Sequence, residues 1–152
     1  QGAVCGGKTP LDCAFETKPA VVFIVVGAHD VAANVPAANF ANNLNQAVAA
    51  TLSHNTIPVL VTIVDMAPGQ EAKYAPYNQA IFDIAKANNI PLFNLYGLKK
   101  LPNLFDGAGN LSDPGGGKRA DFSQGGLKFG VNHGNLNLLL VLDALRTTLP
   151  MP

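Results

Sequence analysis

At residues 18–30 the chain carries the sequence Lys18-Pro19-Ala20-Val21-Val22-Phe23-Ile24-Val25-Val26-Gly27-Ala28-His29-Asp30. After Pro19 and Ala20, the six residues 21–26 are all apolar and all but one of them are β-branched, and a glycine follows. Such a run is typical of a strand buried on both faces, as in a parallel sheet. Gly27 permits a sharp turn, and His29 and Asp30 follow at the carboxyl end of the strand. Open α/β sheets place their ligand sites at that end, so we expect a site there.

Helical and strand patterns alternate along the rest of the chain. After the strand at 20–26, the sequence predicts a helix at 37–52, a strand at 58–64, a helix with Pro76 in its first turn, a strand at 91–96 and a closing helix at 135–149. Leucines surround the closing helix almost completely, so we expect it to be buried on most sides. Between the strand at 91–96 and the closing helix, residues 97–134 are rich in glycine and have little periodicity. A loop of that length is either functional or poorly ordered.

This order of elements predicts a single domain, residues 1–152, with a parallel sheet in a three-layer α/β/α sandwich. Three strands make a thin sheet, however. A first strand at Ala20–Val26 that is buried on both faces needs a neighbour on its outer edge. Either an N-terminal β-α-β piece is absent from this chain, or another subunit covers that edge.

The composition excludes several classes of partner. Ten basic and ten acidic side chains cancel, and there is no basic run, so we expect neither nucleic acid nor an anionic membrane as a partner. No apolar segment approaches the roughly 20 residues of a bilayer span, and we expect no membrane span. The three histidines lack the spacing of a zinc site, so we expect no metal and no cofactor.

Cys5 and Cys13 are the two cysteines, and they flank a short Gly-Gly-Lys-Thr-Pro segment. We expect a disulfide between them, and with it an oxidising, extracellular or cell-surface location; two free thiols are the alternative. The segment Asn110-Leu111-Ser112 is a glycosylation sequon, which makes Asn110 a candidate for modification.

Several segments together resemble the SGNH/GDSL-type hydrolases, in particular secreted bacterial members. The resemblance rests on these segments in this order: Thr9-Pro10-Leu11-Asp12-Cys13, Gly27-Ala28-His29-Asp30, Ile57-Pro58-Val59-Leu60-Val61-Thr62, Tyr77-Asn78-Gln79-Ala80-Ile81, Asn89-Ile90-Pro91-Leu92-Phe93-Asn94-Leu95 and the closing helix. The match covers roughly residues 9–147. It implies a flavodoxin-like sheet and hydrolysis of carboxylic esters, such as carbohydrate or lipid esters, by a Ser-His-Asp arrangement.

The resemblance also implies that parts of this machinery are missing. The family's nucleophile lies in a Gly-Asp-Ser block on the first strand, which would precede residue 1. Gly27-Ala28-His29-Asp30 stands where the family has Gly-x-Asn-Asp, so His29 replaces the oxyanion Asn beside Gly27 and Asp30. The Asp-x-x-His block maps onto Asp113-Pro114-Gly115-Gly116, which keeps the aspartate and places Gly116 where the general base belongs. A serine without an imidazole is a weak nucleophile, and one lost oxyanion donor costs about 3–4 kcal/mol.

The three histidines have functional and structural interpretations. His29 could donate in place of the Asn or bind a metal with Asp30, but a His-Asp pair in such a turn more often satisfies backbone groups. His133 could act as a base for Ser112 or Ser123, although a capping or surface position just ahead of the last helix is favoured. His54 fits a helix C-terminus.

Two functions remain open from the sequence. The first is a secreted, catalytically inactive SGNH-like domain that serves as a structural or binding module and self-associates through its first strand. The second is an esterase whose serine lies on a missing or separate N-terminal segment.

Overall fold

The computed structural model describes residues 6–64, 69–101 and 103–148. The chain divides into two compact units. We call them the sheet unit (residues 1–62 and 75–92) and the C-terminal unit (residues 63–74 and 93–152). Each is described by itself.

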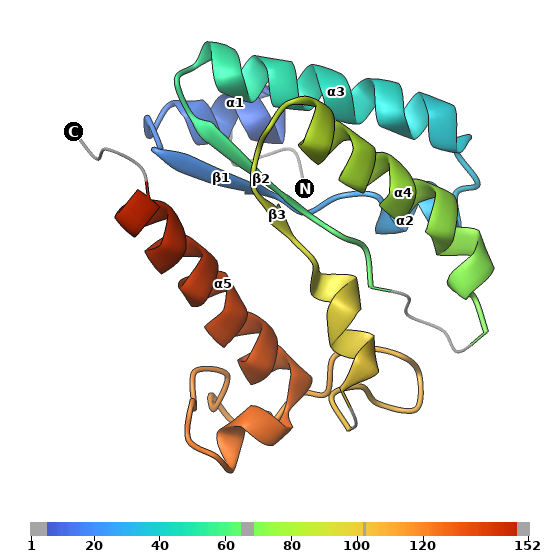
Figure 1. The fold of residues 1–152 in the computed structure, drawn as a ribbon, viewed down its shortest axis with the longest axis vertical. Coiled ribbons are helices and arrows are strands. Elements are labelled where there is room, and N and C mark those ends of the chain that lie inside the picture. Colours follow the sequence, from blue (N-terminus) through green and yellow to red (C-terminus); the bar gives the residue numbers. More distant parts are fainter. Residues whose placement is uncertain (1–5, 65–68, 102, 149–152) are drawn as a thin grey trace. The chain divides into compact units, whose positions relative to one another are not determined.

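A three-stranded parallel sheet confirms the α/β class predicted from the sequence. Its strands are β1 (Val21–Ile24), β2 (Ile57–Val61) and β3 (Leu92–Phe93), in the spatial order β1-β2-β3 (Figure 1). β1 and β2 are parallel and in register from Val21 opposite Ile57 to Ile24 opposite Leu60. Central strand β2 carries the most deeply buried residues of the sheet, because it has a neighbour on each side.

The first strand is shorter and less buried than the sequence predicts. β1 ends at Ile24, and the side chains of Val25 and Val26 are 67% and 46% exposed. Ile24 is the one buried residue of β1, and the other three are half-buried, so the prediction of burial on both faces is wrong. The physical reason is position: within the described part of the chain, β1 is an edge strand and is covered less completely than β2.

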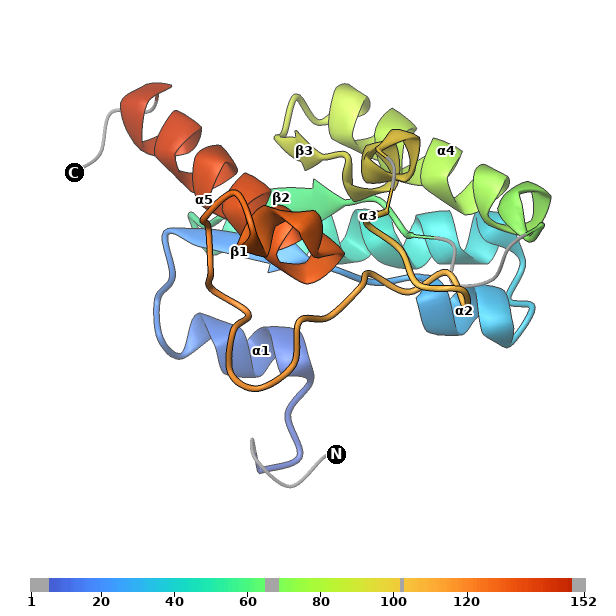
Figure 2. The ribbon, with the colours of Figure 1, turned by 90° about the horizontal axis from the view of Figure 1, so that it is seen from below.

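Helices α3 (Ala37–Ser53) and α4 (Glu71–Ala87) run side by side (Figures 1 and 2). The predicted helix at 37–52 is confirmed by α3, whose buried residues Phe40, Leu44, Val48 and Thr51 form one stripe. The ring of Phe40 lies 5.5 Å from that of Tyr77 in α4, and the Tyr77 hydroxyl donates to the carbonyl of Val35. These contacts hold α4 against α3 and the residue pair that precedes it.

Helix α4 begins earlier than predicted. Pro76 lies inside it, five residues after Glu71, and not in the first turn. Proline removes one backbone donor, and this loss is tolerated near a helix start, where few intrahelical bonds precede it. The carbonyl of Gln70 accepts from the amide of Lys73, which begins the helix before the proline.

Two short helices complete the sheet unit: α1 (Pro10–Phe15) and α2 (Ala28–Ala32). Thr9 caps α1, since its hydroxyl accepts from the Asp12 amide at 3.2 Å. The Phe15 ring at the end of α1 stacks on the His54 imidazole at the end of α3, with centroids 3.9 Å apart. Cys13 lies in α1, whereas Cys5 is outside the described residues, so the disulfide stays a prediction.

The C-terminal unit contains two 3₁₀ helices, η1 (Leu95–Lys100) and η2 (Gly126–Lys128), and the long helix α5 (Gly130–Thr148). β3 stops at Phe93, before the predicted end at 96, because the Asn94 side chain accepts from the Gly97 amide and starts η1. Hydrogen bonds order the glycine-rich segment between η1 and α5. For example, the Ser112 amide donates to the Leu104 carbonyl, and the Ser112 carbonyl accepts from Val131.

Helix α5 differs from the prediction in its start and in its burial. It begins at Gly130, five residues before the predicted start. Its buried residues are Gly130, Asn132 and Gly134, whereas Leu139 and Leu140 are 50% and 56% exposed. The prediction of burial on most sides is therefore wrong. Small residues at the start of α5 allow the chain to pack closely there: a Cβ on Gly130 would lie 2.0 Å from the Leu104 carbonyl oxygen.

No helix in the described ranges is both long and apolar enough to cross a membrane.

Candidate active site

Gly27 forms a sharp turn after β1, as the sequence predicts. This buried residue adopts φ +107° and ψ −24°, a left-handed conformation that a residue with a Cβ rarely adopts. It forms the N-cap of α2, and its carbonyl accepts from the Val31 amide at 2.9 Å. The chain therefore turns directly from the sheet into α2, which carries the next two candidate residues.

His29 and Asp30 are the second and third residues of α2. His29 is exposed and Asp30 is half-buried. Their carbonyls accept from Ala33 at 2.8 Å and Val35 at 2.9 Å, so their backbone groups shape the turn. Within the described part of the chain, neither side chain makes a hydrogen bond, and no group of three or more His, Cys, Asp or Glu side chains is placed to hold a metal. Their oxyanion-site roles stay predictions.

Asp113 is engaged by an arginine. Arg119 Nε and Nη2 lie 2.9 and 2.6 Å from Asp113 Oδ2, and Nε lies 3.2 Å from Oδ1. The Gly115 amide also donates to Oδ1, at 2.9 Å. The hydrogen bond from Arg119, followed by that from Gly115, lowers the pKa of the Asp113 carboxyl. Both carboxylate oxygens are therefore occupied by local donors.

Gly116 lies in a run of three left-handed glycines. Gly115, Gly116 and Gly117 have φ of +66°, +56° and +77°. A Cβ on Gly116 would meet no atom within 4 Å, so the backbone conformation, not lack of space, favours glycine there. Gly116 therefore presents no side chain, and its assignment to the general-base position of the family stays a prediction.

A second segment, which is not among the candidates predicted above, has the same Asp-x-x-Gly spacing. Asp106-Gly107-Ala108-Gly109 ends in a buried glycine with φ +83°. Asp106 Oδ1 accepts from the amides of Ala108 and Asn110, both at 2.9 Å, and the hydrogen bond from the Asn110 backbone is the largest cause of its lowered pKa. A search for every Asp-x-x-Gly would have found both segments, because the spacing occurs twice.

The Asp106 segment borders a cavity of about 350 Å³. Glu71 and Lys99 also line it, and the Lys99 ammonium lies 3.5 Å from the Glu71 carboxylate. Asn110, the sequon residue, is half-buried and donates through Nδ2 to Asp106 Oδ2 at 3.3 Å. Its glycosylation stays a prediction.

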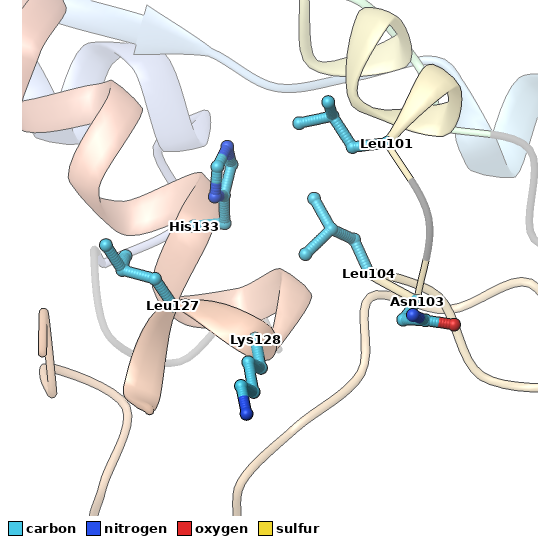
Figure 3. Close-up of a pocket in the computed structure, with 6 residues that line it drawn as sticks. All are labelled: Leu101, Asn103, Leu104, Leu127, Lys128 and His133. Atoms are coloured by element: carbon cyan, nitrogen blue, oxygen red, sulfur yellow. The ribbon is translucent and has the colours of Figure 1, made fainter. Parts of the chain in front are cut away.

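His133 lies in the first turn of α5, so the prediction that it precedes the last helix is wrong. Its half-buried side chain lines a second cavity (Figure 3). The two serines weighed as nucleophiles have other partners: Ser112 Oγ accepts from the Gly130 amide at 2.9 Å, and Ser123 Oγ from the Gly126 amide at 3.2 Å. Among the described residues, no hydrogen bond joins either hydroxyl to a histidine. His54 is the C-cap of α3, as expected.

A three-stranded parallel sheet whose first strand runs into the turn at Gly27, with helices before and after each later strand, defines an α/β protein. The profile of the GDSL-like Lipase/Acylhydrolase family matches residues 5–134. The chain belongs to this family.

The fold also matches a solved structure, that of the psychrotrophic esterase EstA from Pseudoalteromonas sp., inhibited by monoethylphosphonate. The TM-score is 0.56 at 18% identity, over 97% of this chain and 73% of the esterase chain. At that identity the likeness confirms the fold and carries no statement about activity. A search of curated protein sequences finds no match.

Proposed function

We propose that this chain is a catalytically inactive member of the family that serves as a structural or binding module outside the cell. The proposal rests on the hydrogen bonding of the Asp113 carboxylate and on the absence of an imidazole from its loop. The carboxylate is bound by Arg119 and the Gly115 amide, and Gly116 offers no imidazole. In a Ser-His-Asp arrangement, general-base catalysis uses an imidazole within hydrogen-bond reach of the nucleophile and a carboxylate that orients it.

The positions of Ser112 and Ser123 support the same proposal. Each hydroxyl accepts a backbone amide hydrogen bond that holds the segment leading into α5. Neither hydroxyl has a histidine hydrogen-bonded to it among the described residues, so neither has a base to remove its proton. A hydrogen bond of this kind typically contributes about 1 kcal/mol to folding stability. We therefore explain both serines by their role in stabilising the loop.

Hydrolysis of short p-nitrophenyl esters tests the proposal. We expect no turnover above the buffer rate, and no change on adding a serine-directed phosphonate. Turnover that the phosphonate abolishes would refute inactivity. It would favour the second function, an esterase of carbohydrate or lipid esters whose serine comes from a segment outside these 152 residues. Intact mass of the protein isolated from its native source would show whether such a segment accompanies it.

We further propose self-association through β1. This strand is at the edge of the described sheet, and Val25 and Val26, which follow it, are exposed. An open edge offers backbone donors and acceptors to another strand. Light scattering after size exclusion should give a dimer mass that rises with concentration, and Val26→Lys should lower it. A monomer at every concentration would leave a missing N-terminal segment as the occupant of the edge.

A further inference from the structure

The peptide bond between Asp113 and Pro114 is chemically unlike the others in the chain. Asp113 is the one aspartate of the sequence that a proline follows. Proline has no backbone N–H, and its tertiary amide nitrogen accepts a proton and leaves more readily than that of an ordinary peptide. Asp113 is exposed, and so are residues 115–120, so water reaches this loop. The bond is therefore open to attack by the side chain beside it.

Cleavage of an Asp–Pro bond uses the aspartate side chain as the nucleophile. A carboxylate oxygen attacks the carbonyl carbon of its own residue and closes a cyclic anhydride. The bond from that carbon to the proline nitrogen breaks, and the nitrogen takes a proton from solvent and leaves as a secondary amine. Water then opens the anhydride and restores the side-chain carboxyl beside a new C-terminal carboxyl. The sum is the addition of a water molecule, and nothing is oxidised or reduced.

Two donors hold the Asp113 carboxylate in the folded chain. Oδ2 accepts from Arg119 Nη2 at 2.6 Å and from Nε at 2.9 Å, and Oδ1 accepts from the Gly115 amide at 2.9 Å. An oxygen whose lone pairs are taken up by N–H donors is a poorer nucleophile, and the rigid fork of a guanidinium also fixes the plane of the carboxylate. Among the described residues, Arg119 is the charged side chain bonded to Asp113, so it is the stronger of the two donors.

We propose that Asp113–Pro114 is a latent self-cleavage site of this chain and that Arg119 holds it inactive. Cleavage would cut the C-terminal unit between η1 and α5. The two pieces would stay together in the folded protein, because Ser112 Oγ accepts from the Gly130 amide and the Ser112 carbonyl accepts from the Val131 amide. The inference is independent of the proposed function, since self-cleavage occurs once per chain and needs no ester.

Intact mass under denaturing conditions, after incubation of the whole protein at about pH 4, measures the cleavage; an ordinary aspartate is half ionised there. Arg119→Gln should be cleaved about tenfold faster than the unaltered protein, the rate effect of losing one charge-assisted hydrogen bond. Arg119→Lys keeps the charge but loses the fork, so its rate should fall between the two. In concentrated urea, where the pair is absent, all three proteins should be cleaved at one rate.

Arg146→Gln is the matched control, since Arg146 is an exposed arginine of the same unit that pairs with Asp143 at 2.8 Å. It should be cleaved at the rate of the unaltered protein. Asp113→Asn removes the nucleophile and Pro114→Ala restores an ordinary amide, so neither should be cut at this bond, even in urea. Circular dichroism verifies that each protein is folded before urea is added, and Arg119→Lys decides the question if Arg119→Gln unfolds.

Three results would overturn the inference. The first is a folded Arg119→Gln or Arg119→Lys that is cut no faster than Arg146→Gln. The second is a folded unaltered protein that is cut as fast as the same protein in urea. The third is a set of fragments that end at another bond. The p-nitrophenyl ester assay, run separately, reports on the proposed function and does not bear on these outcomes.

Discussion

Arg119 Nη2 lies 2.6 Å from Asp113 Oδ2, so a guanidinium occupies the carboxylate that the sequence resemblance predicts as the family's catalytic aspartate. Arginine is always charged and presents a rigid fork of donors that fits a carboxylate. In this loop, the pair closes a turn of seven residues around three left-handed glycines. A structural role in closing this turn is therefore enough to explain the presence of Asp113.

The Asp113–Arg119 pair predicts a pH dependence of stability. The pKa of Asp113 is lowered in the folded protein, chiefly by its hydrogen bond from Arg119. A carboxyl with a depressed folded pKa contributes stability above its unfolded pKa and loses it as the pH falls through the folded value. We expect urea midpoints to fall below about pH 4. Asp113→Asn should reduce this acid sensitivity; an unchanged pH profile would contradict the pairing in solution.

His29→Asn tests whether the strand-exit turn retains catalytic potential. His29 is exposed and its carbonyl, not its ring, accepts the hydrogen bond from Ala33. The substitution introduces the Asn that the resemblance predicts at this position, and we expect a change in the free energy of unfolding within about 1 kcal/mol and no esterase activity. A gain of phosphonate-sensitive activity would show that the remaining machinery is present.

Gly116→His adds the imidazole that the family motif requires. Because φ is +56° at this position, we expect destabilisation of about 1–2 kcal/mol. We also expect no ester hydrolysis, since Arg119 and the Gly115 amide hold the carboxylate. Chemical denaturation and the p-nitrophenyl assay check both statements. Hydrolysis by this single variant would show that a competent nucleophile lies within reach.

Gly130→Ala should disturb the start of α5 severely. The added Cβ would lie 2.0 Å from the Leu104 carbonyl oxygen, so the backbone would have to move. Overpacking of this kind costs about 1–3 kcal/mol or more. Gly107→Ala is the control, because a Cβ there meets nothing within 4 Å. Equal melting temperatures for the two variants would contradict the close approach of α5 to the Leu104 segment.

Asn132→Ala should release the loop between Lys118 and Gly126. The Asn132 side chain is fully buried, and its Nδ2 donates to the carbonyls of Lys118 and Gly126 at 3.0 and 3.1 Å. Leaving buried acceptors unpaired costs about 1–3 kcal/mol. Asn135→Ala removes one more exposed bond, to Arg119, and should cost less. Hydrogen exchange of residues 118–126 would report the loosening directly.

The spacing of apolar residues along the chain correctly predicted those elements that need only one covered face. The helix at 37–52 is found almost unchanged as α3, because its apolar stripe needs only one covered face. β1 and α5 are less buried than their sequences predict. The number of apolar residues in a segment does not determine how many neighbouring elements cover it. The start of α5 was missed because two glycines lower helix propensity, whereas close packing against Leu104 requires one of them.

The sequence by itself determined the α/β class, the family, the turn at Gly27 and the glycine at position 116, because each follows from residue type and order along the chain. Only the tertiary structure decided that Arg119 binds Asp113, that Ser112 is bonded to the amide of Gly130, and that Lys128 and His133 share a cavity. Those relations join residues 5 to 18 positions apart, and each involves the irregular segment before α5 or the short helix η2, where no period fixes which side chains meet.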